Sequence, residues 1–219
     1  YSDNDKTEFI KELKKYDIRL SNITNNLNNF VSFIGFLTSK PEQTPYKLGI
    51  YIKNIMRFDA SKENNKTYHP LITYMKKFGD CDDAALLCID TLDLAGYGRP
   101  IRNGILPLPA KMSDGSKITD LASNGYNFPL LVATSTNSIS TPIANSDFHA
   151  ICVYPELRTG LLNILDTRKG LTLSKSKSLL ELVGKFEPTW KRIVIEPVKD
   201  GMVDNNKPYI IIEKPDQKQ

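Results

Sequence analysis

Three side chains that together support nucleophilic chemistry occur in order along the chain. Cys81 lies in the run Gly79-Asp80-Cys81-Asp82-Asp83, His149 opens an apolar run, and Asp166 closes another. A thiol attacks a carbonyl carbon, an imidazole carries the proton, and a carboxylate orients the imidazole. The chain contains only two histidines, so few other assignments compete. The pattern predicts an acyl-transfer site formed by Cys81, His149 and Asp166.

The residues around the cysteine predict that it occupies the first turn of a helix. Asp80 has the side chain of an N-cap, and Asp83 stands three residues later as the acid of a capping box. The free N–H groups and the positive end of the helix dipole favour a thiolate at Cys81 and an oxyanion beside it. The negative charges of Asp82 and Asp83 oppose the thiolate.

The histidine and the aspartate are predicted to share one face of a hairpin. Residues 149–154 and 161–166 form its two strands, and Pro155 to Gly160 form a turn. If Tyr154 pairs with Leu161, His149 falls directly opposite Asp166. The same face then carries the apolar surface on which the Cys81 helix is expected to pack, made of Ile151, Val153, Leu162 and Ile164.

The remaining residues of chemical interest receive structural readings or minor roles. Cys88 lies on the buried side of the predicted helix and Cys152 on the strand face opposite His149, so both are read as structural thiols. His69 precedes a proline and is read as a surface residue. Tyr68 and Tyr74, just upstream of the nucleophile, are candidates for oxyanion or cleft contacts.

No metal or cofactor is predicted. Asp80, Asp82 and Asp83 form an acidic cluster, but they lack the spaced ligands and the terminal glutamate of a calcium loop. Paired Cys or His spacings for zinc and glycine-rich phosphate loops are missing from the sequence.

The elements that position these residues are helical first and stranded later, which predicts an α+β fold with a mostly antiparallel sheet. We expect a helical N-terminal extension over 1–44 and one catalytic domain over 45–219. Apolar spacing predicts helices around Phe9 to Leu13, Ile23 to Leu37, from Thr44-Pro45, from His69-Pro70, from Cys81 to the Gly96–Pro100 stop, and over 179–183. Strands are predicted at 101–108, 129–133, 148–154, 161–166, 192–198 and 209–213, with loops at 109–126 and 135–146.

Composition excludes several classes of protein. Of 219 residues, 40% are hydrophobic and 25% charged, as in an ordinary globular protein. The net charge of +4 comes from scattered basic residues, which argues against a nucleic-acid partner. No apolar stretch reaches the roughly 18 residues of a transmembrane segment, and three cysteines do not make a disulfide framework.

The chain opens at Tyr1; a removed leader would indicate a secreted or cell-envelope protein, but neither compartment nor oligomeric state follows from the sequence.

The segment from Tyr46 to Arg102, with the runs His149-Ala150 and Leu165-Asp166-Thr167, resembles the transglutaminase-like superfamily, in particular its microbial cysteine peptidase and amidase branch. The resemblance spans about residues 45–168. It implies a papain-like core in which Cys81 is the nucleophile, His149 the general base and acid, and Asp166 the residue that orients the imidazole. Two features depart from the family pattern: Ile151 replaces a frequent aromatic residue, and the Cys81–His149 separation is longer than in compact members.

These observations predict an enzyme that hydrolyses an amide or peptide bond of a protein or peptide substrate through a thioester on Cys81. Two alternatives stay open. A lysine amine in place of water would make the protein a transglutaminase, since the cleft decides which acceptor reaches the thioester. A non-catalytic binding module that keeps the fold is the alternative from another class.

Overall fold

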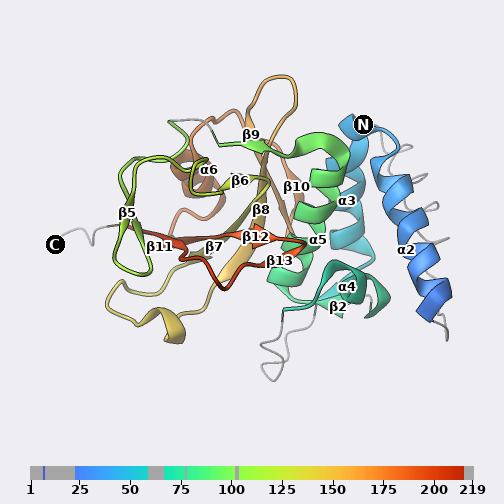
Figure 1. Cartoon of the computed structure of the whole chain (residues 1–219), viewed down its shortest axis with the longest axis horizontal. Coiled ribbons are helices and arrows are strands. Elements are labelled where there is room, and N and C mark those ends of the chain that lie inside the picture. The colour runs from blue at the N-terminus through green and yellow to red at the C-terminus, as the bar shows by residue number, and fades with distance from the viewer. Residues whose placement is uncertain (1–6, 8–22, 59–66, 77, 102–103, 215–219) are drawn as a thin grey trace.

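The computed structural model describes residues 7, 23–58, 67–76, 78–101 and 104–214. Its helices gather on one side of a large sheet, and a single further helix covers the opposite side (Figure 1). This arrangement confirms the predicted α+β class with an antiparallel sheet. The predicted apolar stripe of Phe9, Ile10 and Leu13 falls outside the described residues.

The helical layer follows the signals in the sequence. Cys81 begins α5 (Cys81–Leu92), which continues into a π-helical turn, η2 (Asp93–Tyr97), and ends where Gly96 adopts a φ of 85°. A positive φ of this kind suits glycine and stops a helix. The other helices of the layer are α2 (Ile23–Thr38), the 3-10 turn η1 (Pro41–Gln43), α3 (Thr44–Asn54) and α4 (Pro70–Lys76).

The sheet contains eight antiparallel strands in the order β10-β9-β8-β7-β11-β14-β4-β5. Its central strands are runs of β-branched and other apolar residues that are buried on both faces. Their bounds are β4 (Ala110–Met112), β5 (Lys117–Ile118), β7 (Leu130–Ser135), β8 (His149–Pro155), β9 (Leu162–Asp166), β10 (Gly170–Thr172), β11 (Arg192–Glu196) and β14 (Ile210–Glu213).

Three two-stranded pairs and two short helices complete the fold. The predicted strand at 101–108 is wrong, because the part of it that the structure describes forms turns and bends. The predicted loop at 109–126 instead contains β4 and β5. The remaining elements are β1 (Arg57–Phe58) with β2 (Phe78–Gly79), β3 (Arg99–Pro100) with β6 (Asn127–Phe128), β12 (Val198–Lys199) with β13 (Met202–Val203), the 3-10 turn η3 (Ile143–Asn145) and α6 (Leu179–Phe186).

The sheet separates two hydrophobic cores. One side packs α2, α3 and α5 against Ala150, Cys152 and Leu165, and the other packs α6 against Ile151 and Ile164. The expectation that Ile151, Val153, Leu162 and Ile164 face the Cys81 helix is therefore wrong. They lie on the α6 side, because α5 covers the alternate residues of β8 and β9.

The register of the predicted hairpin is also wrong, by two residues. Tyr154 pairs with Asn163 rather than with Leu161, because the ladder continues past Pro155 and the N–H of Glu156 donates to the Leu161 carbonyl at 2.8 Å. Since side chains alternate with a period of two, an even shift preserves the face. Residues 149 and 166 thus remain on one face, displaced diagonally.

The described part of the N-terminal extension is not separate from the rest. Phe33 and Leu37 of α2 are fully buried in the core that contains α3 and α5. Among the described helices, none combines the length and apolar character needed to cross a bilayer.

Candidate active site

The first turn of α5 carries the predicted capping box. The Asp83 N–H donates to the Asp80 carboxylate at 3.3 Å, and the Asp80 N–H donates back to Asp83 at 3.1 Å. The N–H of Tyr68 adds a bond to Asp83 at 2.6 Å. These bonds fix the helix start and hold Cys81 as its first residue, half-buried.

The Cys81 thiol lies against the N-terminal end of β8, where the Ala150 N–H donates to it. Burial raises the pKa of this thiol to about 11, and the charges of Asp82 and Asp80 add to the effect, against the opposing bonds from the Ala150 and Cys81 N–H groups. Burial and the two acidic charges therefore outweigh the electrostatic field of the helix start, which favours a thiolate. The resting group is a neutral thiol at neutral pH.

The imidazole of His149 is held by a buried carboxylate. Its Nε2 lies 3.0 Å from Oδ2 of Asp166, whose side chain is fully buried, whereas the imidazole is 18% exposed. The Lys169 N–H also donates to Asp166 at 2.5 Å. Burial opposes ionisation of Asp166, but these bonds and the charges of His149 and Arg168 together lower the pKa of that carboxyl below its ordinary value. Asp166 is thus an ionised anchor for the ring.

The structure brings the three predicted residues to the same end of β8. The thiol contacts the N–H of Ala150, the residue that follows His149 in the chain. The imidazole itself leans to the α6 side of the sheet, with its ring stacked on Phe186 at 6.4 Å between centroids. The structure records no hydrogen bond between Cys81 and His149, both of which it describes. Because Nε2 is engaged with Asp166, Nδ1 is the nitrogen that remains for the thiol proton.

The loop before His149 is anchored by a buried arginine. Arg192 of β11 donates to the carbonyls of Ile139 and Thr141 at 2.7 and 3.0 Å, and its ion pair with Glu213 spans 3.0 Å. A further bond reaches the hydroxyl of Ser146 at 3.2 Å. The polar loop therefore has a fixed path to the strand that carries the imidazole.

A cleft of about 710 Å³ opens at the thiol, over β7 and β11 beside α5. Sequence reasoning missed Glu196 at the end of β11, because a single acid after a buried strand carries no chemical signature. Burial and the charge of Asp82 raise the pKa of the Glu196 carboxyl. The lining residues are Thr67, Cys81, Asp82, Leu131, Ala133, Ile143, Phe148, Ala150, Val194, Glu196, Met202, Val203, Asn205 and Tyr209.

The two tyrosines predicted for the cleft are not among its lining residues. Tyr74 lies in the core, its ring stacked on Phe33 at 4.7 Å. Tyr68 donates its backbone N–H to Asp83, and its ring lies 4.0 Å below the Lys76 ammonium. Thr67, whose hydroxyl donates to Asp82 at 2.8 Å, occupies the cleft wall instead.

The residues that could hold a cation are the three acids at the start of α5. One carboxylate oxygen of each of Asp80, Asp82 and Asp83 lies within 4.8 Å of the others, the one such group in the described part of the chain. Burial, and a hydrogen bond that the protonated Asp80 carboxyl donates to Asp82, raise the pKa of Asp80 to about 8. The cap and the bonds from Thr67 and Tyr68 already use oxygens of these groups.

The other cysteines and the second histidine lie as predicted. Cys88 and Cys152 are fully buried in the core shared by α5 and β8, and all three cysteines are free thiols. His69 is exposed, and its ring accepts the Leu71 N–H at 3.2 Å at the start of α4.

Comparison with protein-family models finds no match, and comparison with curated proteins finds no sequence of significant similarity. The function of the chain is therefore inferred from its own residues.

Proposed function

We propose that this protein is a cysteine-dependent acyl-transfer enzyme that hydrolyses amide or peptide bonds through a thioester on Cys81. One observation carries the proposal. The Asp166–His149 pair, with its carboxylate buried, lies at the end of β8 where the Cys81 thiol contacts Ala150, and the thiol and Ala150, but neither member of the pair, line the cleft. The motif resemblance to the transglutaminase-like superfamily, and the papain-like core that it implies, agree with this reading.

The raised pKa of Cys81 shapes the mechanism, because the resting thiol carries its proton. As the sulfur attacks the substrate carbonyl, His149 takes the thiol proton on Nδ1, so a C–S bond forms while the S–H bond breaks. Collapse of the tetrahedral species breaks the C–N bond, and the imidazolium gives its proton to the departing amine. Water, activated by the same ring, then cleaves the thioester and restores the thiol.

The start of α5 supplies donors for the oxyanion. Within the first turn, the Asp83 N–H is used by the cap and the Ala84 N–H donates to the Asp80 carbonyl. The Asp82 N–H remains, and the Cys81 N–H contacts its own sulfur in the resting state. Such N–H groups at a helix start stabilise the negative charge that develops on the carbonyl oxygen.

Transamidation and pure binding are the alternatives. A lysine amine that reaches the thioester before water would make the enzyme a transglutaminase. A binding module needs none of the three residues for its activity. The buried carboxylate that orients His149 favours an enzyme over a module, because a structural histidine has no need of a charged and desolvated partner.

A peptide library read by mass spectrometry tests the proposal. Wild type is incubated with the library, with and without methylamine, and each variant is run beside it. Hydrolysis produces new termini, and transamidation produces methylamide products. We expect hydrolysis that disappears in Cys81→Ala and in His149→Ala and persists in the control Glu42→Gln, which changes an exposed acid of η1. Methylamide as the main product would favour the transglutaminase. Cleavage that survives Cys81→Ala would overturn the proposal.

A further inference from the structure

Every charged residue that lines the cleft at Cys81 is an acid. Asp82 of α5 and Glu196 of β11 face this space, with no lysine or arginine in its lining. The pKa of Glu196 is raised in part by the charge of Asp82, so the two carboxylates repel each other electrostatically. The chain as a whole carries a net charge of +4. The acidity is thus a local property of the cleft.

The side chain of Glu196 is half-buried. Among the described residues, this side chain takes part in no hydrogen bond or ion pair. A desolvated carboxylate without a cation is unfavourable in the empty protein. A ligand that brings a positive charge to this position removes that penalty and gains specificity from it.

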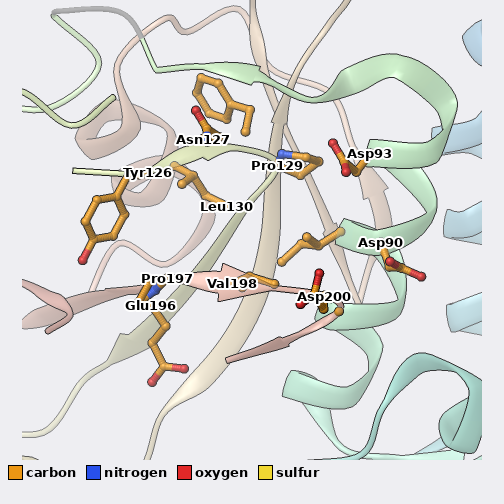
Figure 2. A pocket seen from close by; sticks show the side chains of 14 residues that line it. Asp90, Asp93, Tyr126, Asn127, Pro129, Leu130, Glu196, Pro197, Val198 and Asp200 are labelled. Atoms are coloured by element: carbon orange, nitrogen blue, oxygen red, sulfur yellow. The ribbon is translucent and has the colours of Figure 1, made fainter. Parts of the chain in front are cut away.

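A second pocket, of about 290 Å³, extends the acidic surface on the other side of the β12–β13 hairpin. Figure 2 shows Asp90 on α5, Asp93 at the start of η2 and Asp200 on the hairpin turn around this pocket, while the side chain of Glu196 extends away from them. Glu196 lines both spaces and also a third, more open one that Asp204 and Lys207 share, although no ion pair joins Glu196 to Lys207. Lys207 lies near Gly125 at the rim of the second pocket but is not among the residues that line it.

The shape of the cleft indicates an organic cation rather than a metal ion. Glu196 belongs to no group of three potential metal ligands in the described part of the chain, and hard cations require several close oxygens. The floor beneath Glu196 is apolar, formed by Leu131, Ala133 and Val194. A lysine or arginine side chain matches both features, since its methylene stem packs on apolar surface and its head reaches a carboxylate.

We propose that the cleft selects polypeptide segments with a lysine or arginine side chain, bound by Glu196 and Asp82, next to the carbonyl presented to Cys81. The substrate class rests on the proposed function, whereas recognition of the basic side chain does not require turnover. Glu196 acts here as a specificity-determining residue.

The test compares arginine with citrulline, which has nearly the same shape and no charge. Two peptide pools carry one or the other residue at each position in turn, and their binding to Cys81→Ala is measured by fluorescence anisotropy. We expect the arginine pool to bind about tenfold more tightly at low salt, and the difference to shrink at high salt. Adding Glu196→Gln removes the preference, whereas adding Glu42→Gln retains it. Thermal melts check that each variant is folded.

The outcomes separate the two proposals. Equal binding of the pools, or a preference that survives Glu196→Gln, overturns the recognition of a basic side chain even if wild type cleaves peptides. A preference that depends on Glu196 supports it, and remains valid if wild type cleaves neither pool, in which case only the catalytic proposal fails. Where wild type does cleave, kcat/KM is expected to show the same preference for arginine.

Discussion

His149 and Asp166 meet through Nε2 and Oδ2 at 3.0 Å, although they do not pair across the β8–β9 ladder. The strand register would place residue 168, not 166, opposite His149. The imidazole therefore reaches diagonally along the strand to the carboxylate. A diagonal contact depends on one rotamer of each side chain, so the bonds that fix Asp166 also determine the direction of the ring.

Removal of the charge at position 166 should impair catalysis far more than folding. Asp166→Asn keeps the shape and an acceptor for the Lys169 N–H, but it loses the negative charge that stabilises an imidazolium. We expect kcat/KM on a cleaved library peptide to fall by about 10²–10⁴. Arg168→Gln is the comparison, because the Arg168 side chain is 48% exposed and its ion pair with Asp166 is long, at 3.5 Å. A similar loss in both variants would contradict an orienting role for Asp166.

The reactivity of Cys81 toward iodoacetamide should report a neutral resting thiol. With a pKa of about 11, the labelling rate is expected to rise about tenfold per pH unit from pH 7 and to be still rising near pH 10. Asp82→Asn removes a nearby negative charge, which lowers the thiol pKa and speeds labelling at pH 8. Glu42→Gln should leave the rate unchanged. Fast labelling of wild type at pH 6 would reveal a thiolate–imidazolium pair and sink this prediction.

The carboxyl of Asp80 should make the protein less stable as the pH rises. Its folded pKa is about 8 and its ordinary value is 3.8, so the folded state holds a proton that the unfolded state has released. The stabilisation is complete below about pH 4 and is lost as pH rises through 8. Asp80→Asn preserves an N-cap and removes this dependence. Urea unfolding at pH 5 and pH 8 should show a smaller decline in the variant. An equal decline would show that Asp80 does not titrate in this range.

Loss of Arg192 should loosen the loop that leads to His149. Arg192→Gln removes the bonds to the carbonyls of Ile139 and Thr141 and leaves Glu213 without its cation. We expect a loss of about 2–3 kcal/mol in the free energy of unfolding and faster proteolysis within residues 136–147. Lys199→Gln, which changes an exposed cation of β12, is the control. Proteolysis at the wild-type rate in Arg192→Gln would show that the loop is held by other contacts.

The sequence predicted those parts of the fold that depend on local signals. The cap at Asp80, the glycine stop at Gly96 and the apolar alternation of β8 each specify their element through neighbouring residues. The predicted strand at 101–108 failed because an apolar run does not reveal whether it finds a partner strand. β4 and β5 were missed because they are short and because β14, through which β4 joins the sheet, is remote in sequence.

In the candidate site, too, local sequence signals could be read and contacts between remote segments could not. Cys81, His149 and Asp166 could be proposed from the sequence because their residue types carry chemistry, and the structure places each at the end of an element. Glu196 was missed, since its proximity to Asp82 depends on how β11 lies beside α5. The face of the sheet that α5 covers could not be predicted either. Both faces of β8 are apolar. The alternation of side chains along the strand therefore does not say which of the two faces α5 covers.

The strand order has a consequence for synthesis on the ribosome. The β4–β5 hairpin joins the sheet only through β14, and residues 119–209 separate the two in sequence. At typical translation rates the hairpin waits roughly 5–20 seconds for its neighbour. Throughout that interval Ala110, Met112 and Ile118, which are buried in the finished protein, lack the surface that will cover them. The nascent chain therefore exposes the apolar side chains of this hairpin until residue 213 has been made. This is the stage at which chaperones would matter most.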